Sequence, residues 1–143
     1  MILPFDEHGN LPPGVHWASW DELVARYGDG HRIQMLWPLL YVLSALRDAG
    51  CEAVYIDGSF VTAADTPRDI DIVWDVAGVR FDRLDPVLLE RFPRITQRTL
   101  FACELFPSNI VEAASRKPFF DYFQIDHEGR TKGIVAVDLR GIR

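Results

Sequence analysis

The chain has few cysteines, few histidines and no long hydrophobic run, and each scarcity excludes a class of protein. Its two cysteines, Cys51 and Cys103, lack the spacing of a metal-binding pair, and its four histidines are scattered, so no zinc site is predicted. We expect both thiols to be reduced and buried. The most apolar stretch, residues 35–46, is interrupted by Pro38 and Ser44 and is too short to cross a bilayer.

Positive charge is also scarce. The net charge is −6, which argues against broad electrostatic capture of nucleic acid as the main activity. Thirteen of the 15 basic residues are arginines, which suit bidentate phosphate contacts better than lysines do, so local basic patches remain open. The first residues lack a basic segment followed by an apolar core, so no secretory signal is predicted and we expect a cytoplasmic protein.

Length and composition predict one domain over residues 1–143. The hydrophobic fraction of 48% and the charged fraction of 25% are ordinary for a globular chain. Residues 1–17 contain three prolines and two glycines, which predicts an extended arm. The arm also carries large apolar side chains, so we expect it to pack across the domain.

Two helices are predicted before residue 50. Ser19 and Glu22 have the spacing of a capping box, followed by a short helix that stops at Gly28. A longer helix is expected from about residue 32 to 49, with Pro38 either kinking it or marking its first turn. Its predicted core stripe consists of Ile33, Leu36, Leu40, Leu43 and Leu46.

The second half gives weaker signals. Asp85 and Pro86 predict a helix cap and first position, with a helix to residue 92. Residues 94–106 favour a strand, and residues 109–115 a short helix capped by Ser108. Runs 119–125 and 133–139, joined by a turn at 126–130, predict a hairpin. The fold class is therefore α/β (α+β): a small mixed sheet flanked by helices, with a C-terminal β-hairpin.

The stretch 53–75 carries the chemistry. Two apolar runs, 53–56 and 70–74, predict short strands with Gly58 and Ser59 between them. Successive N–H groups at a glycine turn can bind an anion, and glycine lets a phosphate approach the backbone. Asp69 and Asp71 lie two strand steps of roughly 3.3 Å apart on one face, so their oxygens can converge on one divalent cation, or on two about 4 Å apart.

This order of a strand, Gly58-Ser59, a nine-residue spacer and Asp69-Ile70-Asp71-Ile72 resembles the signature of the DNA polymerase beta-like nucleotidyltransferase superfamily. The resemblance implies that the Gly-Ser turn binds a nucleoside triphosphate and that the two acids hold Mg²⁺, with two ions expected. The opening of the chain is also similar to that of a family of small bacterial proteins predicted to be nucleotidyltransferases, which would extend the resemblance over nearly the whole chain. Asp57 departs from the pattern, because an apolar residue usually precedes the glycine.

The superfamily draws a third carboxylate from a neighbouring strand. Asp121 is the first candidate, because an acid within the apolar run 119–123 would be costly without a cation. Asp138 is the second, and a site with Asp69 and Asp71 alone is the third alternative. Asp126 lies on the same hairpin but begins its turn, where aspartate needs no special reason. Lys132 is a candidate for the triphosphate, against the alternative of a solvated hairpin residue.

The leading hypothesis is a Mg²⁺-dependent nucleotidyltransferase that passes a nucleoside monophosphate to a hydroxyl acceptor and releases pyrophosphate. The acceptor is left open among tRNA, protein and small molecule, as is a toxin–antitoxin or defence context. The alternative is a non-catalytic nucleotide-binding or protein-interaction module that acts through a partner protein or as a homodimer. A metal-dependent phosphodiesterase is a third reading, against which the Gly-Ser turn argues. No membrane partner is expected.

Overall fold

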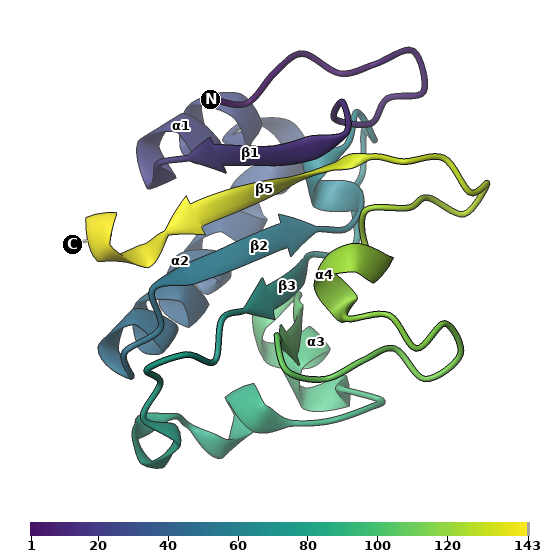
Figure 1. Cartoon of the computed structure of the whole chain (residues 1–143). Helices are drawn as coiled ribbons and strands as arrows, with labels where there is room; N and C mark the ends of the chain where they lie inside the picture. Colours follow the sequence, from purple (N-terminus) through teal and green to yellow (C-terminus); the bar gives the residue numbers. More distant parts are fainter. Residues whose placement is uncertain (143) are drawn as a thin grey trace.

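A computed structural model describes residues 1–142, which form one open, mixed five-stranded sheet. The strand order is β1-β5-β2-β3-β4 (Figure 1). β1 pairs with β5 and β3 with β4 in parallel, whereas β2 pairs antiparallel with both of its neighbours. The predicted α+β class is therefore confirmed. The strands are β1 (Gly14–Ala18), β2 (Ala53–Asp57), β3 (Asp71–Trp74), β4 (Glu104–Pro107) and β5 (Gly133–Asp138).

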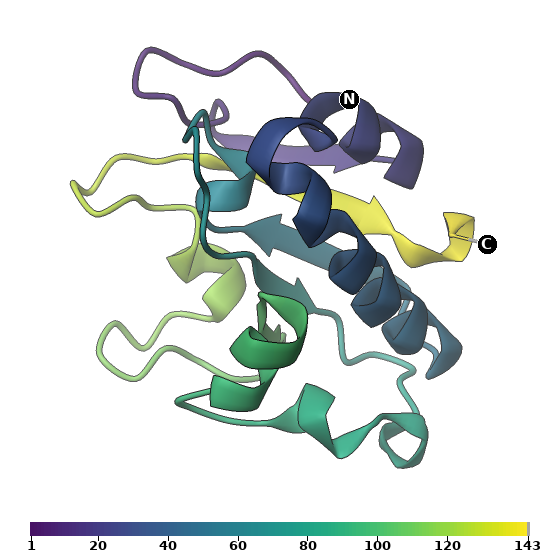
Figure 2. The same cartoon turned by 180° about the vertical axis from the view of Figure 1, so that it is seen from behind.

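Helices cover the two faces of the sheet unequally. The helices α1 (Trp20–Tyr27), α2 (Ile33–Asp48) and α3 (Ile95–Phe101) lie together on one face, with α2 running across the strands (Figure 2). The short helix α4 (Phe119–Tyr122) lies on the other face (Figure 1). Among residues 1–142, no helix combines the length and the apolar character that a membrane crossing requires.

The capping box predicted for the first helix is confirmed. The Ser19 hydroxyl accepts a hydrogen bond from the Glu22 N–H at 3.1 Å, and the Glu22 carboxylate accepts one from the Ser19 N–H at 3.4 Å. The cap satisfies two N–H groups that have no partner within the helix. The helix ends at Gly28, as predicted.

The long helix is confirmed, but its buried stripe is rotated from the predicted one. Leu43 and Leu46 are buried as expected, whereas Ile33 is 53% exposed and Leu36 and Leu40 lie at the margin of the core. Pro38 lies inside the helix and not in its first turn. The helix is apolar on more than one side, so the sheet selects which stripe it covers. The buried positions are Met35, Leu39, Val42, Leu43 and Leu46.

The N-terminal arm packs on the domain, as expected, but its last part is a strand. Leu11 is 1% exposed, and residues 14–18 form β1 at the edge of the sheet. Because β1 pairs in parallel with β5, the arm is held by backbone hydrogen bonds as well as by apolar contacts. Both cysteines are reduced and buried, as predicted.

Several predictions for the second half are wrong. Residues 94–106 form α3 and then β4, not one strand, because the buried Gln97 bonds the Leu105 N–H and the Val87 carbonyl and so fixes a helix at this place. No helix forms over 109–115. Asp85 caps a turn as predicted, but the turn is a 3₁₀ helix, Pro86–Leu89, and does not reach residue 92.

The predicted hairpin is half correct. Its turn is present, since Ile125 bridges Thr131 and the Asp126 N–H donates a hydrogen bond to the Arg130 carbonyl. The run 119–125, however, begins with the helix α4. Phe119 and Phe123 are four residues apart and both pack on Phe106, a contact that helical spacing allows.

Candidate functional site

Three acidic side chains lie on the α4 face of the sheet, where β2 ends and where β3 and β4 begin. Asp57 ends β2 and pairs in register with Asp71, the first residue of β3. Asp71 pairs in turn with Glu104, the first residue of β4. Side chains alternate along a strand, and Ile56 and Ile72 point into the core beneath α2, so these three acids point to the opposite face. β3 begins at Asp71, so Asp69 lies in the loop before the strand, whereas the sequence predicts both acids on one strand face.

The Gly58–Ser59 turn lies against Asp69. Ser59 donates its N–H to Asp69 Oδ1 at 3.0 Å, and its hydroxyl also bonds that carboxylate. Gly58 has φ +92°, and a Cβ there would come within 2.8 Å of the Asp69 carbonyl oxygen. Glycine is therefore required by the backbone of residue 69, in addition to any requirement for an approaching phosphate. The sequence correctly brought Gly58, Ser59 and Asp69 together.

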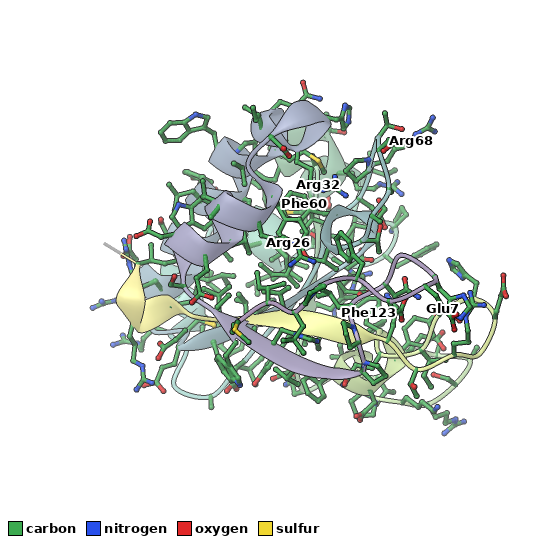
Figure 3. All side chains as sticks on the ribbon, turned by 90° about the horizontal axis from the view of Figure 1, so that it is seen from above. Glu7, Arg26, Arg32, Phe60, Arg68 and Phe123 are labelled. Atoms are coloured by element: carbon green, nitrogen blue, oxygen red, sulfur yellow. The ribbon has the colours of Figure 1, made fainter. Side chains whose placement is uncertain are left out.

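Arg32 fixes the backbone that follows this turn. Its guanidinium donates to the carbonyls of Phe60 at 2.8 Å, Thr62 at 2.6 Å and Ala64 at 2.8 Å. Figure 3 shows Arg32 beside Phe60 on the helix side of the sheet. Arg32 comes directly before α2, so the long helix and the turn are tied together. No local sequence pattern marks Arg32, because its contacts span about 30 positions.

Asp71 has an unusual environment. None of the described residues donates a hydrogen bond to its carboxylate, and burial raises the pKa of that carboxyl well above its usual range. Three neighbouring carboxylates raise the pKa further, in decreasing order those of Asp69, Asp57 and Glu104. The ammonium of Lys132 acts in the opposite direction. A cation placed here would relieve both the burial of the charge and the repulsion.

Asp57, by contrast, has a partner. Lys132 Nζ lies 2.6 Å from Asp57 Oδ1, and the two side chains are 12% and 5% exposed. Burial raises the pKa of Asp57, although Lys132 lowers it. The sequence analysis noted Asp57 only as a departure from the expected pattern. The available signal for an ion pair was a carboxylate at the end of an apolar strand, because a buried charge there needs a partner.

These groups line one cleft of about 690 Å³. Asp57, Asp69, Asp71, Ser59 and Lys132 lie on the sheet side. The segment around α4 and the turn after it supply the remaining wall, with Lys117, Tyr122, Phe123, Asp126 and His127 among its residues. The cleft thus combines carboxylates, an ammonium and an aromatic wall.

The candidates for a third carboxylate lie elsewhere. Asp121 is exposed on α4 and is not among the residues that line the cleft. It was chosen because residues 119–125 were expected to form a strand, and that strand is absent. Asp138 ends β5 whereas Lys132 precedes it, so Asp138 lies at the opposite edge of the sheet, where it pairs with Arg140. Asp57 is the third acid that the structure brings to Asp69 and Asp71.

The donor set fits a hard divalent cation. Asp69 and Asp71 offer carboxylate oxygens, the ligands that Mg²⁺ prefers, and Asp71 has no competing hydrogen bond. Among residues 1–142, no three acidic, histidine or cysteine side chains are arranged to hold a metal ion, and Asp57 is engaged by Lys132. Of these three acids, Asp57 pairs with Lys132, Asp69 accepts hydrogen bonds from Ser59, and Asp71 alone accepts none from the described residues.

Fold and site together define a small α+β domain with an acidic cleft at one edge of its sheet. The chain belongs to DUF6932, a family of unknown function, which matches residues 3–138. Comparison with curated proteins and with solved structures gives no match. The family carries no assigned activity, so the resemblance to nucleotidyltransferases stays a prediction.

Proposed function

We propose that the protein is a nucleotidyltransferase that uses this cleft to transfer a nucleoside monophosphate from a triphosphate to a hydroxyl acceptor. The observation that supports it most strongly is the meeting of Asp71, an unpartnered acid, with Asp69 and the Gly58–Ser59 turn in one cleft. Carboxylates alone would suit many metal-dependent reactions. A glycine turn with N–H groups beside them suits a phosphate chain.

In this proposal Asp69 and Asp71 hold Mg²⁺, which supplies positive charge to the phosphate oxygens when it is bound. The acceptor oxygen forms a bond to the α-phosphorus, and the bond from that phosphorus to the bridging oxygen breaks. Pyrophosphate leaves with the electron pair, and the acceptor hydroxyl releases its proton to water. The aromatic wall at Tyr122 and Phe123 offers a surface for the nucleobase.

Ser59 has a specific part in this proposal. In the structure its N–H and hydroxyl are directed to the Asp69 carboxylate, an internal anion. A triphosphate would compete for the same donors. When the Asp69 carboxylate turns to a cation, the Ser59 N–H and hydroxyl become free for a phosphate. Metal and nucleotide are therefore expected to bind cooperatively.

The test is transfer of label from triphosphates carrying ³²P at either the α or the γ position, with Mg²⁺ and cell extract as the source of acceptor. Transfer of the α label without the γ label is expected, together with release of pyrophosphate. Nucleotide binding without transfer would instead favour a non-catalytic module. Transfer of the γ label would contradict the proposal outright.

A further inference from the structure

Lys132 places a positive charge inside the carboxylate cluster. Its ammonium lies 2.6 Å from Asp57 Oδ1, and both side chains are almost fully enclosed. The backbone on either side is fixed, because the Lys132 N–H donates to the Gln124 carbonyl and the Gly133 N–H to the Leu11 carbonyl. The ammonium is therefore held at this corner of the cleft, and it is not a mobile surface group.

The charges around the ammonium are those of a site for one divalent ion. Asp57, Asp69 and Asp71 contribute three negative charges and Lys132 one positive charge, which leaves a formal −2. One Mg²⁺ neutralises that charge, whereas two would overshoot it. Asp69 and Asp71 remain without a cationic partner, and the described residues offer no third ligand arranged with them.

We propose that Lys132 replaces the second metal ion, so that the cleft holds one divalent cation on Asp69 and Asp71 while the ammonium stays on Asp57. This inference rests on the proposed function and changes its expected two ions to one. Lys132 then supplies the phosphates with charge that a second ion would otherwise supply.

The consequence is a count of bound ions that changes when Lys132 is removed. In Lys132→Met the Asp57 carboxylate loses its partner and becomes a third ligand, which allows a second ion to bind. Lys117 is the matched control, because it is the only other lysine, lies on the opposite wall of the same cleft and is exposed. Lys117→Met removes the same charge without freeing Asp57.

The experiment counts bound Mn²⁺ from the loss of the free-ion signal in electron paramagnetic resonance, because Mn²⁺ accepts the same oxygen ligands as Mg²⁺. We expect one ion per chain in the wild type, two in Lys132→Met and one in Lys117→Met. Two ions in the wild type, or one in Lys132→Met, would overturn the inference. If Lys132→Met does not fold, Lys132→Ala, which leaves room for water beside Asp57 but no donor side chain, is counted with the same expectation of two.

Transfer of α label by the wild type, measured on the same preparation, separates this inference from the proposed function. Transfer with two bound ions overturns the inference alone. One bound ion without transfer overturns the function alone. No bound ion overturns the inference and, with it, the role given to Asp69 and Asp71.

Discussion

Replacing Asp71 by asparagine should stabilise the metal-free protein at neutral pH. Asp71 faces Asp57 on one side and Glu104 on the other, and Asp69 lies two residues before it, in the loop that leads into β3. A like-charged pair on neighbouring strands costs about 0.2–1 kcal/mol. Lys132 offsets part of this repulsion, so about two unfavourable neighbours remain.

The expected gain is therefore about 0.4–2 kcal/mol in the free energy of unfolding. For a domain of this size, about 3 °C in melting temperature corresponds to each kcal/mol, which gives a rise of roughly 1–6 °C. Asparagine nearly keeps the shape of aspartate, so no cavity is formed. Its amide can also donate hydrogen bonds to the neighbouring carboxylates.

The pH dependence supplies a second check. The folded-state pKa of Asp71 is raised above the unfolded value of 3.8, so the folded state binds more protons between the two values. The free energy of unfolding is thus not lowered by the Asp71 charge below pH 3.8, and it is lowered by the full amount above the raised pKa. The advantage of Asp71→Asn should be largest above the raised pKa and should vanish as the pH falls toward 3.8.

Differential scanning fluorimetry in EDTA from pH 4.5 to 8 measures both effects, with Asp121→Asn as a control of the same chemistry on an exposed acid. Added Mg²⁺ should raise the melting temperature of the wild type and leave that of Asp71→Asn unchanged. A variant no more stable than the wild type at pH 7, or a gain independent of pH, would refute the reasoning.

Three further predictions follow from single contacts. Arg32→Met removes hydrogen bonds to three carbonyls and should lower the free energy of unfolding by about 2 kcal/mol in urea titrations, with weaker triphosphate binding. The stability of Arg32→Lys should lie between those of the wild type and Arg32→Met, since an ammonium lacks the planar fork of a guanidinium. Ser19→Ala should cost about 1 kcal/mol and leave nucleotide affinity unchanged by calorimetry, and equal stability would exclude the cap. Gln97→Leu leaves the Leu105 N–H and the Val87 carbonyl without their partner and should cost about 2–3 kcal/mol, whereas a loss below 0.5 kcal/mol would contradict this.

Local signals in the sequence predicted both helices and the strand before Gly58 in the first half of the fold, but not β1. The capping box at Ser19 and the apolar runs around Gly58 act over a few residues, so their structures follow from neighbouring positions. The second half depends on contacts across the sheet. Phe119 and Phe123 were taken for a strand because aromatic residues favour strands, yet they pack as successive turns of a helix on Phe106.

The candidate site divides in the same way. Gly58, Ser59, Asp69 and Asp71 lie within 14 residues of one another, and their spacing placed them together correctly. The partner of Asp57 is 75 positions away, so no spacing rule could predict it. The prediction that Asp121 is the third carboxylate depends on a strand over residues 119–125. It has no basis in the structure, because residues 119–122 form the helix α4.

The central claim is that the cleft around Asp71 carries out nucleotidyl transfer. Its most direct test is the rate of α-label transfer by Asp71→Asn, measured beside the wild type and Asp121→Asn with the same triphosphate, Mg²⁺ and acceptor. We predict a fall of about 100-fold or more for Asp71→Asn, the size expected when a group that stabilises developing charge is lost, and an unchanged rate for Asp121→Asn. Wild-type transfer by a folded Asp71→Asn would contradict the claim.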